Sequence, residues 1–207
     1  MRFASRSLLF LLLVFPIGVC CAQEAFELDQ GFRTTFERVA VHSAISLPNG
    51  SVIISCNIDN PSPLGGYWYL LRLFPNGTMD TGFAFEVGGG GKLILRDSVF
   101  YISQEFVWRA YLDGRRDTTF DMYPGINSLY SPGSTFDYHV FPDGRILLSG
   151  DGFVHHPELG NLGEFNLIWF NANGQLDYTR TNRRANGATY QFAELPDGKF
   201  IVTCNCT

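Results

Sequence analysis

Residues 141–150 read Phe-Pro-Asp-Gly-Arg-Ile-Leu-Leu-Ser-Gly, a tight turn followed at once by a short hydrophobic run. Proline presets the backbone φ angle and the Asp-Gly pair favours a β-turn, so a strand is expected to begin where the chain reverses. The phrase recurs at residues 48–55 and 196–203, and a degenerate copy with Ser98 in place of the glycine lies at residues 97–103. In all four copies an Asp or Asn stands six residues before a Ser or Thr.

A second phrase alternates with the first. It consists of an aromatic-rich strand, an Asn-Gly or Asp-Gly turn, and an Asp three residues after the glycine, and it occupies residues 67–83, 106–120 and 167–177. Residues 28–32 carry only its last part. Asn-Gly and Asp-Gly between hydrophobic strands are the strongest short-range signal for a β-hairpin.

The spacing of the first phrase predicts the architecture. Successive turn residues Asn49, Asp97, Asp143 and Asp197 are 48, 46 and 54 positions apart. Short strands and turns with a period near 50 residues are typical of β-propeller blades. We therefore predict an all-β fold of blades centred near residues 48, 97, 143 and 197. Each blade is expected to have four strands: one before the first turn, the hydrophobic run, the aromatic strand and a short Asp-x-x-Phe segment.

The hydrophobic runs are predicted to form the buried inner strands. Their residues are hydrophobic in succession, which indicates that both faces of each strand are covered. The predicted inner strands are Val52–Ile54, Val99–Ile102, Ile146–Leu148 and Phe200–Val202. The strands before them are predicted at Val39–Leu47, Thr135–Phe141 and Thr189–Leu195.

The first 22 residues have the features of a secretory signal peptide. Arg2 and Arg6 precede the hydrophobic run Leu8–Phe15, and Cys20 and Ala22 place small residues before a cut at position 23. No run reaches the roughly 20 apolar residues of a membrane-spanning helix. Residues 23–207 then form the propeller repeats of a secreted or cell-surface protein. At about 50 residues per blade they make three to four blades, fewer than most closed propellers have. We expect an incomplete propeller, with further C-terminal blades and a sorting or anchor domain beyond the sequence.

The net charge limits the kinds of binding partner, and the cysteine content limits the disulfides that can form. Losing two arginines with the signal peptide changes the net charge from −5 to −7, and no basic cluster is present, which argues against nucleic acid or anionic membrane. Three cysteines remain, Cys56, Cys204 and Cys206, so at least one thiol is left over. Cys204 and Cys206 point the same way on a strand and are poorly placed to bridge each other. Whether any disulfide forms among the three is left open.

Taken together, the two phrases resemble the delta-60 repeat, a β-propeller repeat of exported and surface proteins that is common in bacteria. The resemblance covers nearly all of residues 23–207 and is clearest at residues 76–83, 113–120 and 197–199. Ser98 in the second unit and Tyr178-Thr179-Arg180 in the third depart from it, so those two blades are expected to be less regular. The resemblance implies a fold and a location, and no catalytic residues.

Repeated polar and aromatic residues have both a functional and a structural interpretation. The recurring aspartates could form a cation-binding ring or accept backbone N–H bonds in turns, and their repetition in every unit favours turns; they are Asp29, Asp80, Asp117 and Asp177. The recurring phenylalanines could be a ligand platform but more often pack between blades; they are Phe32, Phe83 and Phe120.

Other candidate sites are weaker. His155-His156-Pro157-Glu158 carries metal-ligating groups, but adjacent histidines usually point apart, and a solvated loop within the insertion Asp151–Glu164 is favoured. Residues 88–92 are glycine-rich but lack the motif and helix of a phosphate loop, so we expect a flexible connection between blades. No Gly-x-Ser-x-Gly motif nominates a nucleophile.

Two functions remain. The preferred one is a secreted, non-enzymatic propeller module that binds a protein or glycan, without metal or cofactor. The alternative is a metal-dependent propeller hydrolase or lactonase with ligands near the ends of the inner strands. The residues there are Ser55, Ser103, Ser149, Thr203, Asn57, Gln104 and Asp151, a weakly ligating set.

Overall fold

The computed structural model describes residues 30–36, 39–59, 67–84, 86–104, 106–122, 130–156 and 158–205. The predicted signal peptide, Asp29 and Cys206 lie outside these ranges. The chain divides into two parts after Gln30, and the fold described below is that of the second, Gly31–Thr207. Across the described ranges, no helix has the length and apolar character needed to cross a bilayer.

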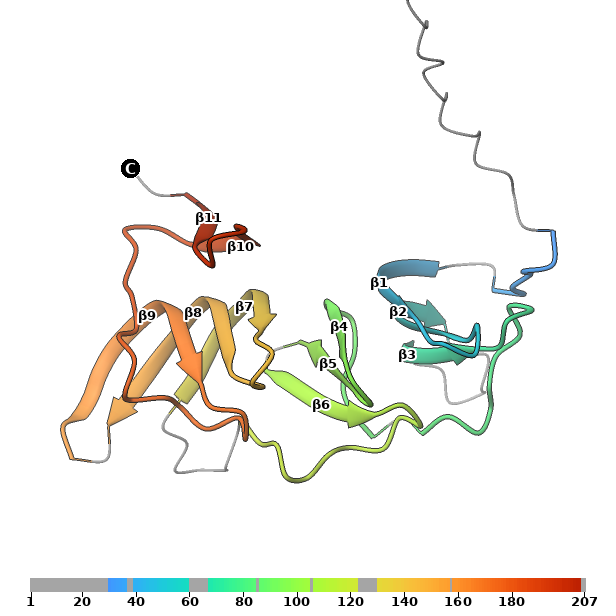
Figure 1. Cartoon of the computed structure of the whole chain (residues 1–207), viewed down its shortest axis with the longest axis horizontal. Coiled ribbons are helices and arrows are strands. Elements are labelled where there is room, and N and C mark those ends of the chain that lie inside the picture. The colour runs from blue at the N-terminus through green and yellow to red at the C-terminus, as the bar shows by residue number, and fades with distance from the viewer. Residues whose placement is uncertain are drawn as a thin grey trace, which may run out of the picture. The chain divides into compact units, whose positions relative to one another are not determined.

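The described part of the chain is all-β and forms four small antiparallel sheets, one for each predicted repeat unit (Figure 1). Unit 1 comprises β1 (Val39–Ser46), β2 (Val52–Asp59) and β3 (Tyr67–Leu73). Unit 2 comprises β4 (Leu93–Arg96), β5 (Val99–Ser103) and β6 (Val107–Tyr111). Unit 3 comprises β7 (Tyr130–Val140), β8 (Ile146–His156) and β9 (Gly160–Phe170). Unit 4 comprises β10 (Thr189–Glu194) and β11 (Phe200–Cys204).

The turns follow the prediction from the sequence. In six turns the glycine N–H donates to the carbonyl oxygen three residues earlier and the glycine φ lies between +76° and +89°; these glycines are Gly50, Gly77, Gly114, Gly144, Gly174 and Gly198. In unit 2, where Ser98 replaces the glycine, the positive φ (52°) passes to Asp97. Short polar side chains such as Asp tolerate this region better than most, so the hairpin is kept with a different turn.

The predicted fourth strand of each blade is wrong. Within the described residues, the segment after each aromatic hairpin makes only one bridge to the preceding strand, such as Leu73 with Met79 and Ala110 with Arg116. The chain then turns, because Phe83 N–H donates to the Asp80 carbonyl oxygen. The Asp-x-x-Phe segment is therefore a turn that lies against the sheet.

The prediction that the long insertion in unit 3 forms a loop is also wrong. Residues 151–156 and 160–164 continue β8 and β9, which pair from Ile146 opposite Phe170 to His156 opposite Gly160. Since β7 begins at Tyr130, earlier than predicted, and pairs with β8 as far as Val154, this sheet is longer than those of units 1 and 2. The extension is thus part of a paired β-sheet.

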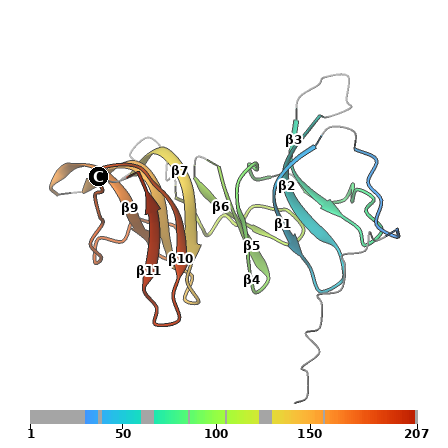
Figure 2. The ribbon, with the colours of Figure 1, turned by 90° about the horizontal axis from the view of Figure 1, so that it is seen from above.

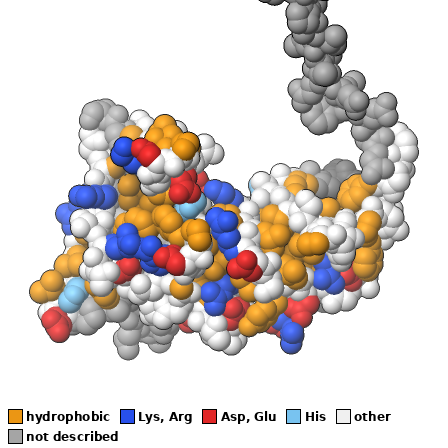
Figure 3. Space-filling model, in the orientation of Figure 1, with side chains coloured by type: hydrophobic (Ala, Val, Ile, Leu, Met, Phe, Trp, Pro, Cys, Tyr) orange, Lys and Arg blue, Asp and Glu red, His pale blue; other side chains and the backbone are white. Residues whose placement is uncertain are grey.

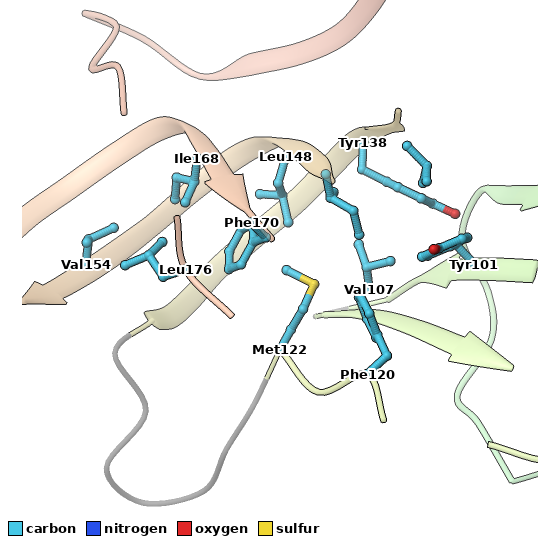
Figure 4. Close-up of a cluster of buried hydrophobic side chains, with 12 residues drawn as sticks. Tyr101, Val107, Phe120, Met122, Tyr138, Leu148, Val154, Ile168, Phe170 and Leu176 are labelled. Atoms are coloured by element: carbon cyan, nitrogen blue, oxygen red, sulfur yellow. The ribbon is translucent and has the colours of Figure 1, made fainter. Parts of the chain in front are cut away.

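Successive sheets pack against each other through hydrophobic faces, and Figure 2 shows the sheets of units 1, 2 and 3 in chain order, with β10 and β11 overlapping unit 3 in this view. One core cluster joins units 1 and 2 and includes Ile53, Leu70, Phe83 and Phe100. A second joins units 2 and 3 (Figure 4). Its members are Tyr101, Val107, Phe120, Met122, Tyr138, Val140, Ile146, Leu148, Val154, Ile168, Phe170 and Leu176.

The inner-strand prediction is confirmed in three units. The strands β2, β5 and β8 are central in their sheets, and their hydrophobic runs are largely buried. It is wrong for Phe200–Val202, where the Ile201 side chain is 54% exposed. In the described part of the chain the fourth sheet has only two strands, so β11 is an edge strand with little to cover it.

Candidate functional site

The repeated aspartates are turn residues. In unit 2 the Asp117 Oδ1 accepts hydrogen bonds from the Thr119 amide (2.9 Å) and hydroxyl (2.6 Å). Asp177 accepts the same pair from Thr179, and Asp80 accepts from the Gly82 amide at 2.9 Å. The structural interpretation is confirmed for these three aspartates, and Asp29 lies outside the described residues. Among the described residues, no group of three or more His, Cys, Asp or Glu could hold a metal ion.

Each of the first two aspartates also pairs with an arginine that sequence reasoning missed. Arg72 donates from Nε to Asp80 Oδ2 and Arg109 to Asp117 Oδ2, both at 2.7 Å. The signal was present, since arginine stands eight residues before the Asp in both units. Burial alone would raise the pKa of Asp80, but hydrogen bonds from Arg72 and the Gly82 amide, together with the charge of Arg72, outweigh it and lower the pKa.

The same arginines stack on the repeated phenylalanines. The Arg72 guanidinium carbon lies 5.2 Å from the centre of the Phe83 ring, and that of Arg109 lies 4.9 Å from the Phe120 ring. Phe83 and Phe120 are 2% exposed and belong to the clusters between units, which confirms the packing interpretation.

Unit 3 has the same contact between an arginine and an aromatic ring, but the two residues have exchanged their positions in the sequence. Trp169 stands where units 1 and 2 have the arginine, and Arg180 stands where they have the phenylalanine. The Arg180 guanidinium carbon lies 4.6 Å from the Trp169 ring centre, and Arg180 forms an ion pair of 3.5 Å with Asp177. The departure noted in the sequence at Tyr178-Thr179-Arg180 thus conserves the cation–aromatic contact.

A second repeated contact fastens each unit to the next hairpin. The residue four positions after the repeated Asp donates its N–H to the carbonyl before the next turn glycine. The three pairs, at 2.9–3.0 Å, are Arg33 with Asn76, Ala84 with Asp113, and Asp121 with Asn173. We call this the turn contact. Arg72 and Arg109 reinforce it by donating to the carbonyls of Leu112 and Ala172 in the same hairpins.

The hydroxyl groups of the serines at the ends of the inner strands form hydrogen bonds with backbone groups. Ser55 Oγ accepts from the Gly90 amide (2.9 Å), and Ser103 Oγ from the Lys92 amide (3.2 Å). Ser149 Oγ donates to the Thr189 carbonyl (2.6 Å). The glycine-rich residues 88–92 connect units 1 and 2, and a Cβ on Gly91 would lie 1.9 Å from the Ser103 carbonyl oxygen. The predicted connection between units is confirmed, and its flexibility stays a prediction. Ser55 and Ser149 thus link their units to the segment that follows, and Ser103 makes its contact within unit 2.

The histidine pair lies at the tip of the unit 3 hairpin. His156 Nδ1 accepts from the amides of Glu158 (3.1 Å) and Leu159 (3.2 Å), and its ring contacts Tyr178 at 4.7 Å. A nitrogen that accepts two backbone hydrogen bonds closes the turn, so it is poorly available to a metal ion.

The strongest candidate site is a polar pocket beside the extended part of unit 3. The pocket has a volume of about 630 Å³. It is lined by Asp151, Gly163, Glu164, Asn166, Arg184, Ala185, Asn186, Gly187 and Ala188. Its polar groups belong to no repeated position, apart from Asp151, which follows the hydrophobic run Ile146–Leu148 of β8.

Asn166 holds one wall of this pocket. Its Nδ2 donates to the Gly150 carbonyl (3.2 Å), and its Oδ1 accepts from the Ala185 amide (2.8 Å). Arg184 donates to the Leu162 carbonyl and lies 4.7 Å from the Phe165 ring centre. The side chains are thus presented from a paired β-sheet and a segment hydrogen-bonded to it, an arrangement that fixes a binding surface before a ligand arrives.

The chemistry of the pocket suits a ligand with many hydroxyl groups. Asp151 and Glu164 bring carboxylates and Arg184 brings a guanidinium to the same pocket. Phe153 does not line the pocket, but its side chain is 47% exposed and it is the cross-strand partner of Glu164, so it lies on the sheet next to a residue of the pocket. Hydrogen-bonding groups next to an aromatic ring match the polar edges and apolar C–H faces of a sugar.

The two described cysteines differ. Cys56 is a buried free thiol whose pKa is raised to about 11 by burial, so it is unreactive. Cys204 is disulfide-bonded. A disulfide fits the oxidising compartment that the predicted signal peptide implies.

The comparisons with known proteins bear on the fold. A family model described as a β-propeller domain of unknown function (DUF5122) matches residues 65–83 and 142–179. These segments contain the second phrase of unit 1 and both phrases of unit 3. No curated protein matches the chain. The matches support a β-propeller repeat family, and the narrower resemblance to the delta-60 repeat stays a prediction.

Proposed function

We propose that this chain is an exported, non-enzymatic β-propeller module that binds a glycan in the polar pocket of unit 3. The proposal rests on the observation that repeated and non-repeated polar residues have different roles in the structure. The described repeat-borne aspartates, arginines and serines are engaged in turns and contacts between units. Carboxylates and a guanidinium that lie outside the repeat pattern gather at the polar pocket of unit 3.

Support for export comes from the sequence. The first 22 residues have the basic start, hydrophobic run and small residues of a signal peptide. Expression of the whole chain in a cell that secretes proteins tests this directly. Recovery outside the cytoplasm, with an N-terminus at residue 23, is the expected result, and a cytoplasmic protein that keeps Met1 is the contradictory one.

Binding is tested with a panel of purified glycans and cell-wall polysaccharides. We expect saturable binding that weakens at least tenfold in Glu164→Gln and Arg184→Ala. Asp59→Asn, an exposed carboxylate of unit 1, serves as the matched control and should bind like the unaltered chain. Binding that is unchanged in both pocket variants would place the site elsewhere.

The alternative, a metal-dependent hydrolase, has one observation in its favour. Asp151 lies within β8, just after the hydrophobic run Ile146–Leu148, and lines the pocket together with Glu164. Metal analysis of the purified chain separates the two functions. Stoichiometric Ca²⁺ or Zn²⁺ that is lost in Asp151→Asn would support the hydrolase and count against the binding module.

A further inference from the structure

We propose that the polar pocket of unit 3 selects glycans whose sugars carry a free amino group, as in a chain of glucosamine, and that Glu164 accepts the ammonium. The inference rests on the proposed function, because it concerns the same pocket and names the class of glycan. The charge of the pocket, a carboxylate without a partner and a bulge in β8 point to this ligand.

The pocket has an excess of negative charge. Asp151 and Glu164 contribute two carboxylates and Arg184 contributes one guanidinium, and the other lining residues are uncharged, so the formal charge is −1. A hydrogen bond between charged partners is about twice as strong as one between neutral groups. A protonated amine gains this advantage at a carboxylate, whereas a neutral hydroxyl or acetamido group gains only part of it.

The guanidinium of Arg184 is directed toward β9. It donates to the Leu162 carbonyl, and its Cζ lies 4.7 Å from the centre of the Phe165 ring. A Cβ on Gly163 would lie 3.0 Å from Arg184 Nη2, so the missing side chain lets the guanidinium approach the strand. Among the described residues, Arg184 forms no ion pair with Glu164. Its positive charge is therefore held against β9 and leaves that carboxylate unpaired.

Glu164 is the carboxylate that a ligand can use. It lies on β9 two residues before Asn166, so the two side chains project from the same face of the strand, and both line the pocket. The Asn166 side chain is already hydrogen-bonded to backbone on both sides. Glu164 is exposed, and no described residue donates to its carboxylate or forms an ion pair with it. An ammonium brings three N–H donors.

A β-bulge brings Asp151 to the same pocket. In the pairing of β8 with β9, Gly150 and Asp151 together stand opposite the single residue Asn166. An extra residue of this kind re-aims a side chain, and bulges are common beside functional sites. Asn166 spans the bulge, since its Nδ2 donates to the Gly150 carbonyl at 3.2 Å. Carboxylates therefore reach the pocket from two paired strands.

Long-range attraction alone does not explain a preference for an amino sugar. The net charge of −5 favours any cationic ligand. On the face drawn in Figure 3, acidic and basic side chains are interspersed, so neither sign dominates that face. Selection of an amino sugar over another cation therefore depends on contacts in the pocket, where the amine and the hydroxyl groups bind together.

Two matched tetrasaccharides test the inference. The tetramer of glucosamine and its N-acetylated counterpart share one backbone and differ in whether the nitrogen is charged. Titration calorimetry with the full chain should show at least tenfold tighter binding of the free-amine tetramer. The difference should shrink at high salt, because Glu164 is exposed and its charge is screened. Tetralysine has the same net charge as the protonated tetramer and should bind at least tenfold more weakly.

One variant assigns the preference to its residue. Glu164→Gln keeps the shape of the side chain without its charge, so the preference for the free amine should disappear. Asp59→Asn removes an exposed carboxylate of unit 1 and should keep the preference. Equal affinity of the two tetramers for the unaltered chain, an unchanged preference in Glu164→Gln, or tetralysine binding as tightly as the glucosamine tetramer would overturn this inference alone. Binding of no glycan at all would overturn the proposed function with it.

Discussion

Gly114→Ala tests the turn contact, because it adds one methyl group between two units. Gly114 has φ = +89°, and a Cβ there would lie 2.1 Å from the Ala84 carbonyl oxygen. Gly198 has a similar φ of +76° with nothing within 4 Å of its Cβ. Gly198→Ala therefore measures only the free-energy cost of placing alanine at a positive φ, and it is the matched control.

The two substitutions should differ by several kcal/mol in the free energy of unfolding. The positive φ costs about 1–2 kcal/mol at either position. At Gly114 the Ala84 backbone must also retreat by about 1 Å to reach an ordinary contact. That shift breaks the 2.9 Å hydrogen bond from Ala84 to Asp113, worth about 1 kcal/mol, and strains the packing by about 1–3 kcal/mol. Gly114→Ala is thus expected to cost about 3–6 kcal/mol.

Urea unfolding followed by circular dichroism measures both variants against the unaltered chain. We expect a loss of about 1–2 kcal/mol for Gly198→Ala and about 3–6 kcal/mol for Gly114→Ala. Equal losses would refute the reasoning, because the backbone term alone would then account for both and the units would not be docked at this turn.

Three further predictions follow from the same contacts. Trp169→Arg and Arg180→Phe should each destabilise the chain, while the double variant, which recreates the pair of units 1 and 2, should melt within a few degrees of the unaltered chain; additive losses in the double-mutant cycle would contradict this. Leu148→Ala, at a side chain that is 0% exposed between units 2 and 3, should cost about 2–5 kcal/mol in urea unfolding, and a neutral result would contradict the assigned core. The lowered pKa values of Asp80 and Asp117 mean that their stabilisation is present above the ordinary carboxyl pKa of about 3.9 and is lost as pH falls through the lower folded values. Asp80→Asn should accordingly flatten the loss of stability measured in acid, and an unchanged slope would argue against the Arg72 ion pair.

Much of the fold could be predicted because the repeats carry local signals. The turn glycines, the central strands β2, β5 and β8, and the buried Phe83 and Phe120 all follow from spacing and turn chemistry that a single sequence displays. The Asp-x-x-Phe segment was misassigned as a strand because strand and turn share the same residues there. Hydrogen bonds to the Asp80 carboxylate, which the sequence does not display, decide between them.

The candidate site was harder to predict than the fold. Arg184 and Asn166 have no repeated counterpart, and they meet only because the chain after Asp177 returns along β9, where Arg183 pairs with Leu167. The exchange of Trp169 and Arg180 likewise looked like a loss of pattern, because residues eleven positions apart become neighbours only once the hairpin has folded back.

The most direct test of the central claim, that the turn contact joins successive units, is the hydrogen exchange of the Ala84 and Asp121 amides. Neither residue lies in a strand, and each amide donates across a boundary between units at 2.9 Å. The structure predicts protection comparable to that of the central strands β5 and β8. Exchange at the rate of an unprotected loop at both amides would contradict the claim.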